Sequence, residues 1–144
     1  MILIPDYETY WETIKVRLTA IKTLEYITND KDMKDTIQGL KKENMPVLFV
    51  VIPSGDGGGD IDNDTEKNIG LLFLMSKYAS LGKTKGYDIL KELQPVFEQI
   101  KDLIKEDSAN KCGVMANLEF DSMHTDPEYK LYSDFSGWSL SFVF

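Results

Sequence analysis

The sequence predicts an α+β protein in which two amphipathic helices pack on one mainly antiparallel sheet. Three observations predict this class: two segments repeat apolar residues at helical spacing, several runs are rich in β-branched and aromatic residues, and a glycine-rich stretch separates two of these runs. The expected order is α-β-β-α-β-β. With 144 residues, the chain has the usual size of one domain, so we expect residues 1–144 to form a single domain.

The first helix is predicted over residues 6–29. Asp6 is its expected N-cap, because a carboxylate can accept from the unpaired N–H groups of a first turn. The charge-rich residues 30–44 are predicted to connect this helix to the sheet, with a helical turn or a short strand inside them. The apolar stripe of the helix consists of Tyr7, Trp11, Ile14, Leu18, Ile21 and Leu24.

A β-hairpin is predicted in the middle of the chain. PVLFVVIP (residues 46–53) is an unbroken β-branched and aromatic run between two prolines, which is typical of a strand inside a sheet. NIGLLFLMSKYAS (residues 68–80) is the expected antiparallel partner. The stretch between them, PSGDGGGDIDND (residues 53–64), then becomes a long flexible hairpin tip.

The second helix is predicted to start near Asp88. Pro95 lies within its pattern, so the helix either kinks there or begins there, and we favour a kink. Its apolar stripe is wide enough to face a sheet or another helix. The stripe consists of Leu90, Leu93, Phe97, Ile100 and Ile104, widened by Ile89, Val96 and Leu103.

Two final strands are predicted at residues 113–121 and 132–144, joined by the loop SMHTDPEYK (residues 122–130). In the last strand, alternation places four bulky residues on one face and small residues on the other. Such a strand either forms an exposed edge that pairs with another chain or lies covered by the helices of its own chain. The bulky residues, which we expect to take part in interactions, are Trp138, Leu140, Phe142 and Phe144.

The glycine-rich stretch partly matches a calcium-binding EF-hand loop. Asp60, Asp62 and Asp64 occupy the first three ligand positions, but Thr65 replaces the required glycine and Leu71 the bidentate glutamate. These three aspartates remain the candidates for a different Ca²⁺ or Mg²⁺ site. The alternative, which we favour, is a solvated hairpin tip without metal.

The chain carries no convincing nucleotide or catalytic motif. GKT (residues 82–84) lacks the earlier glycine of a P-loop, since position 77 is lysine, and Gly86 interrupts the helix that should follow. The only histidine, His124, could share a metal with Asp121 and Asp126, but it lacks the partners that zinc prefers. No motif supports Cys112 and His124 as a nucleophile and base. We therefore predict no catalytic residue and no cofactor.

Charge and hydropathy limit the expected partners. Sixteen basic and twenty-four acidic residues give a net charge of −8, which opposes binding to nucleic acid and to anionic lipid. No apolar run could span a membrane, and the N-terminus does not resemble a signal peptide, so we expect a cytoplasmic protein. One basic and aromatic cluster could touch phosphates but is better explained as balancing an acidic surface; it contains Lys77, Tyr78, Lys83, Lys85 and Tyr87.

The layout and the terminal GWSLSFVF (residues 137–144) resemble small tail-terminator or tail-completion proteins of long-tailed bacteriophages and prophages. The resemblance covers most of the chain and rests on element order and on the last strand. It implies a non-enzymatic structural protein, cytoplasmic or in the virion, that forms a ring, often a hexamer, and caps the tail tube. Gly57, Gly58 and Gly59 would then give the hairpin tip the freedom to dock on a neighbouring subunit.

Two other classes stay open. The first is a small acidic binding or regulatory protein, such as an immunity protein, that uses its negative surface against a basic partner. The second is a metal- or nucleotide-dependent enzyme. The expected partners are accordingly further copies of the chain or another protein, with neither membrane nor nucleic acid.

Overall fold

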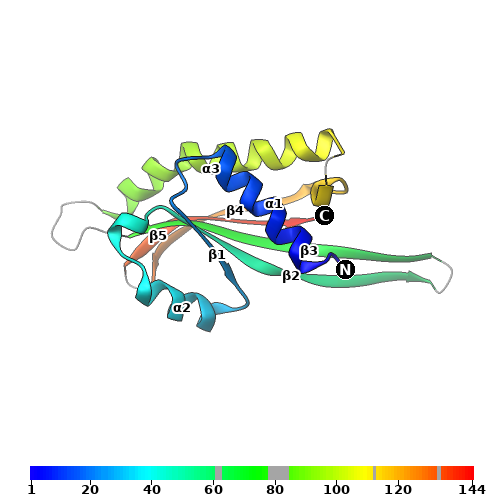
Figure 1. Cartoon of the computed structure of the whole chain (residues 1–144), viewed down its shortest axis with the longest axis horizontal. Coiled ribbons are helices and arrows are strands. Elements are labelled where there is room, and N and C mark those ends of the chain that lie inside the picture. Colours follow the sequence, from blue (N-terminus) through cyan, green and yellow to red (C-terminus); the bar gives the residue numbers. More distant parts are fainter. Residues whose placement is uncertain (61–62, 78–84, 112, 133) are drawn as a thin grey trace.

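The computed structural model describes residues 1–60, 63–77, 85–111, 113–132 and 134–144. Within these residues, three α-helices accompany a five-stranded mixed sheet (Figure 1), which confirms the α+β class. The sheet order is β1-β2-β3-β5-β4; β1 and β2 are parallel and all other neighbours are antiparallel. The strands are β1 (Thr23–Ile27), β2 (Val47–Asp60), β3 (Asn63–Lys77), β4 (Glu119–Leu131) and β5 (Phe135–Val143).

The helices cover both faces of the sheet. α1 (Ile4–Arg17) and α3 (Gly86–Ala109) lie on one face, and α2 (Asp30–Gly39) lies on the other (Figure 1). The prediction of two helices on one sheet is therefore right for α1 and α3 but omits α2. The larger core, under α1 and α3, contains Trp11, Phe97 and Phe142, and the smaller core, under α2, contains Met33, Phe49 and Phe135.

The first helix is shorter than predicted. It has Pro5 in its first turn, is preceded by Leu3 and not Asp6 as its N-cap, and ends at Arg17. Residues 23–27, which the apolar spacing assigns to the same helix, form β1 and pair in parallel with Val47–Val51. Leu18 and Ile21 still enter the larger core, so the same apolar spacing is satisfied by a helix followed by a strand.

The charge-rich connector contains α2. Asn29 caps this helix, since its side-chain oxygen accepts a hydrogen bond of 3.0 Å from the backbone N–H of Asp32. Met33 and Ile37, one turn apart, are buried against the sheet. The helical alternative that the sequence left open is thus realised, as a helix of 10 residues.

The second predicted helix, α3, begins at Gly86 and continues through Pro95, so Pro95 does not start it. The apolar stripe predicted for it faces the larger core. Its buried members are Ile89, Leu93, Phe97, Ile100 and Ile104.

The prediction of a loop at residues 122–130 is wrong, because this segment belongs to strand β4. His124, Thr125 and Asp126 lie opposite Ser141, Leu140 and Ser139 of β5. The predicted start of the strand at Gly113 is also wrong: residues 113–115 form a 3₁₀-helix. β4 is paired on one side only and is mostly exposed, which explains its polar, loop-like composition.

Candidate functional site

The strands β2 and β3 extend together beyond the rest of the sheet as a two-stranded ribbon, which we define as residues 54–60 and 63–68 (Figure 1). Its register runs from Gly55 opposite Asn68 to Asp60 opposite Asn63. β1 last pairs with β2 at Val51, and β5 last pairs with β3 at Ile69. An isolated two-stranded ribbon is only marginally stable in water, so contacts with a partner would stabilise it.

The ribbon changes the prediction for the glycine-rich stretch. Gly57, Gly58 and Gly59 do not lie in a loop; they are part of β2 and pair with Glu66, Thr65 and Asp64. The residues between the two strands, 61 and 62, lie outside the described residues. The hairpin itself is therefore confirmed, and its regular pairing extends much further than the apolar runs predict.

A β-bulge separates the ribbon from the sheet. Val51 lies opposite Leu71, whereas Ser54 lies opposite Ile69, so β2 contains one residue more than β3 over this interval. Before the bulge, Val50 faces the larger core. Beyond the bulge, Gly55 lies opposite Asn68, and Asn68 lies on the face of the sheet that bears the larger core.

Asn68 fixes the base of the ribbon through hydrogen bonds to Ile2 and Phe144. Its side-chain oxygen accepts a 2.9 Å hydrogen bond from the backbone N–H of Ile2, and its side-chain amide donates to the Phe144 carbonyl at 3.2 Å. The terminal amino group of Met1 pairs with the Glu66 carboxylate. The first residues of the chain therefore lie along the base of the ribbon.

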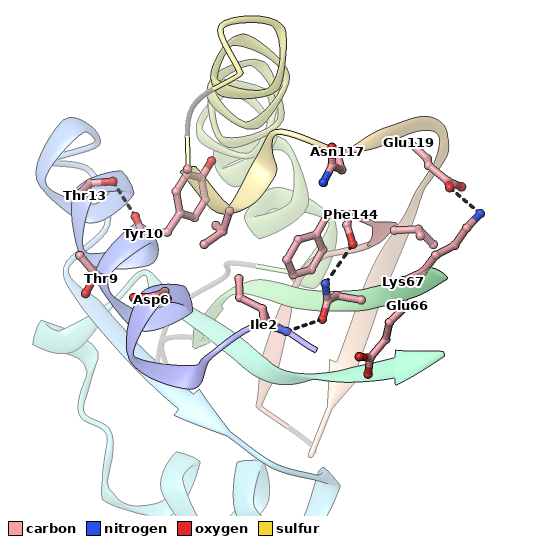
Figure 2. A pocket seen from close by; sticks show the side chains of 14 residues that line it. Ile2, Asp6, Thr9, Tyr10, Thr13, Glu66, Lys67, Asn117, Glu119 and Phe144 are labelled. Atoms are coloured by element: carbon pink, nitrogen blue, oxygen red, sulfur yellow. Dashed lines mark hydrogen bonds and ion pairs between the residues drawn. The ribbon is translucent and has the colours of Figure 1, made fainter. Parts of the chain in front are cut away.

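An open cleft of about 860 Å³ lies between α1, the ribbon base and the start of β4 (Figure 2). Lys67 and Glu119 pair at its rim with 2.5 Å between the ammonium nitrogen and the carboxylate oxygen. The hydroxyls of Thr9 and Thr13 already donate to backbone carbonyls of α1. The cleft is also lined by Ile2, Asp6, Asn117, Val143 and Phe144, among others, so it presents both apolar and polar groups.

An ion pair between Arg17, which is exposed, and Asp107, which is buried, joins the helical wall of this cleft to α3. Asp107 of α3 accepts hydrogen bonds from the Arg17 guanidinium, at 2.7 and 2.9 Å, and from the Tyr10 hydroxyl, at 3.0 Å. Burial, followed by the negative charge of Asp107, raises the pKa of the Tyr10 hydroxyl. The arrangement joins α1 to α3.

The candidate metal site at Asp60, Asp62 and Asp64 stays a prediction, because these three side chains are not among those that the structure describes. The backbones of Asp60 and Asp64 belong to opposite strands of the ribbon, and Asp62 lies outside the described residues. Among the side chains that the structure does describe, no group of three or more from Asp, Glu, His or Cys could hold a metal ion.

The bulky face of β5 packs inside the chain. β5 lies between β3 and β4, so both of its edges are paired, and the covered alternative is the one that the structure shows. The Trp138 indole N–H donates to the Leu90 carbonyl of α3 at 2.9 Å. A role for this face in interactions stays a prediction. Its residues Trp138, Leu140, Phe142 and Phe144 all belong to the larger core or pack against it.

The other sequence candidates also lie apart from the cleft. The His124 Nε2 and an Asp126 carboxylate oxygen lie 3.1 Å apart, and both side chains are exposed on β4. The Lys77 ammonium nitrogen lies 3.9 Å from an Asp134 carboxylate oxygen. This acidic neighbour favours a role of Lys77 in balancing surface charge over a role in phosphate binding. The GKT sequence (residues 82–84) and Cys112 fall outside the described residues, as do Tyr78 and Lys83 of the basic cluster.

Sequence reasoning missed both Asn68 and the Tyr10, Arg17 and Asp107 contact. The partners of Asn68 lie 66 and 76 positions away, so no local pattern signals its role. Arg17 did carry a signal, because it is the only arginine in the chain. Both of its hydrogen bonds to the Asp107 carboxylate come from Nη1, and arginine is favoured over lysine in ion pairs of this partly buried kind.

None of the helices in the described ranges is long and apolar enough to cross a lipid bilayer. In comparisons with known proteins, no protein-family model matches the chain, and no curated protein matches it.

Proposed function

We propose that the chain is a non-enzymatic structural or assembly protein that works through protein contacts, as a ring subunit of the tail-terminator type. One observation carries the proposal: the ribbon of β2 and β3 projects from the folded body with two strands only (Figure 1). A projecting ribbon of this kind is stabilised when a neighbour covers it. The partner is a second copy of the chain or a component of the same assembly.

A variant with a shortened ribbon tests this role. Replacing residues 57–66 by Asn-Gly places a two-residue turn directly after the Asp56 and Lys67 pair, and it leaves Asn68 in place. The wild-type chain is expected to form oligomers in light scattering and rings in electron microscopy, and the shortened chain is expected to stay a folded monomer. A wild-type chain that is monomeric at high concentration and does not bind a tail-tube protein would contradict the proposal.

A second candidate function is an acidic binding or regulatory protein, as in the immunity-like alternative. The charge of the ribbon favours it, since residues 54–68 contain five acidic residues and one lysine. Such a protein binds a basic partner without forming oligomers of its own. A tight complex with one foreign protein, together with a monomeric free chain, would distinguish this function from ring assembly.

A further inference from the structure

The outer edge of β2 in the ribbon carries unused backbone hydrogen-bonding groups. The backbone N–H and C=O of Asn68 are both hydrogen-bonded to Phe144 of the neighbouring strand. They therefore point away from β2, so the opposite residues Gly55 and Asn68 form a non-hydrogen-bonded pair of the ribbon. Alternation along an antiparallel ladder then makes Asp56 and Lys67 the hydrogen-bonded pair. The N–H and C=O of Gly55 and Gly57 consequently point away from β3.

No strand covers this edge in the described part of the chain. β1 pairs with β2 only as far as Val51, and β3 occupies the opposite side. Natural proteins protect open strand edges with large charged side chains or proline. Here the outward backbone groups belong to glycines, and a Cβ built on Gly57 would meet no atom within 4 Å. A Cβ points to a face of the sheet, so this space lies beside the strand, and the edge itself is left open because the pairing with β1 ends at Val51.

The surface beside this edge can receive a side chain. A hollow of about 200 Å³ is lined by Asp56, Gly57, Gly58 and Lys67. Lys67 forms its ion pair with Glu119, and Asp56 makes no ion pair within the described residues. The hollow thus offers an uncompensated carboxylate to a cationic side chain.

The charge of the ribbon also selects the partner. Residues 54–68 hold five acidic residues and one lysine, and the whole chain has a net charge of −8. A second copy of the chain would bring like charge to this edge, whereas a segment rich in lysine or arginine would bring opposite charge.

We infer that the outer edge of β2 from Gly55 to Gly59 binds an extended, basic segment of a different protein by strand addition. Backbone hydrogen bonds from Gly55 and Gly57 hold the segment, and Asp56 contacts its cationic side chains. This inference rests on the proposed role of the ribbon in docking, and it specifies the edge and the chemistry of the partner.

A matched pair of variants isolates the edge. Gly57→Pro removes the outward N–H without removing a hydrogen bond to β3, and Gly57→Ala keeps this N–H. The probe is the capped octapeptide (Lys-Thr)₄, with (Glu-Thr)₄ as its charge control. The measurements are the dissociation constant by calorimetry and the amide exchange rates of Gly55, Asp56 and Gly57 by NMR. Equal thermal midpoints of the two variants would show that both are folded.

The lysine peptide is expected to bind, to slow exchange at Gly55 and Gly57 at least tenfold, and to leave the already protected Asp56 amide unchanged. Gly57→Pro should bind it about fivefold more weakly than Gly57→Ala, as the loss of one hydrogen bond predicts. Absence of binding, equal affinity of the two variants, or preference for (Glu-Thr)₄ would overturn the inference. Protection of the same amides that rises with protein concentration alone would also overturn it, in favour of a second copy.

The two proposals fail separately. A chain that still forms rings while Gly57→Pro and Gly57→Ala bind the peptide equally well would overturn strand addition and leave the assembly role standing. A chain that binds the lysine peptide at Gly55 and Gly57 but never forms rings or joins a tail assembly would overturn the assembly role and leave strand addition standing.

Discussion

Asn68 and Phe144 exchange two backbone hydrogen bonds, each 2.9 Å long, at the position where the ribbon leaves the sheet. The Asn68 side chain adds contacts to Phe144 and Ile2, so one residue joins the ribbon to both ends of the described chain.

Asn68→Ala is expected to lower the free energy of unfolding by about 2 kcal/mol, because two hydrogen bonds are lost and the Ile2 N–H loses its acceptor. Urea denaturation measures this. Asn117→Ala is the matched control: Asn117 lines the same cleft but is exposed, and its replacement should change stability by less than about 0.5 kcal/mol. Equal losses in the two variants would contradict the role given to Asn68.

Tyr7 and Tyr10, on the same helix, should respond in opposite ways to replacement by phenylalanine. The Tyr7 hydroxyl is buried and has no hydrogen-bond partner among the described residues, whereas the Tyr10 hydroxyl donates to Asp107. Removing the unpaired hydroxyl in Tyr7→Phe should raise the free energy of unfolding by about 1 kcal/mol. Tyr10→Phe should lower it by about 1 to 2 kcal/mol, since Asp107 loses a donor. Thermal denaturation of the two variants measures the change. Shifts of the two midpoint temperatures in the same direction would contradict the prediction.

Stability should fall steeply in alkali. Burial raises the pKa of Tyr7, Tyr10 and Tyr26 above the value of about 10 that tyrosine has in an unfolded chain. Above pH ~10 the unfolded state therefore loses protons that the folded state retains, and unfolding becomes more favourable as the pH rises. Below pH ~10 this contribution is fully present. Urea midpoints measured at increasing pH, with tyrosinate absorbance as a second signal, check the direction; ionisation of all tyrosines while the fold persists would contradict it.

Gly137→Ala should prevent stable folding. A Cβ at this position would lie 1.9 Å from the carbonyl oxygen of Leu74 on the neighbouring strand β3. Backbone cannot move away without breaking the β3 and β5 ladder, so a loss of at least about 3 kcal/mol is expected. Gly39→Ala serves as the control, because a Cβ there meets nothing within 4 Å. Circular dichroism of both variants decides: a well-folded Gly137→Ala protein would show that the strands are further apart than described.

The sequence predicted the parts of the fold that depend on local periodicity. The stripe along α3 and the alternation from Trp138 to Phe142 were readable because each pattern repeats within one element. β1 was not readable, because Leu18, Ile21 and Leu24 fit a helical spacing equally well. Pairing with Val47–Val51, more than twenty positions away, decides in favour of a strand.

The candidate site was only partly readable. The glycine-rich stretch stands out in the sequence, yet nothing local indicates that it pairs regularly with residues 63–68. The cleft depends on Ile2, Asn68, Glu119 and Phe144, which come from distant parts of the chain. β4 was missed as a full strand because an edge strand can remain polar, and polar runs are also typical of loops.

The bulge between Val51 and Ser54 determines which residues of β2 lie on each face of the ribbon beyond it. Its extra residue inverts the two sides of β2, so that Gly55 faces Glu66 and Met1, where a Cβ would come within 2.6 Å of the Glu66 carboxylate. Deleting Ile52 alone would remove the extra residue from β2 and leave the pairs beyond it unchanged, with Gly55 opposite Asn68 and Asp56 opposite Lys67. Such a deletion would shorten β2 by one residue without reversing the ribbon, because the alternation of β3 determines which residues of β2 share each face.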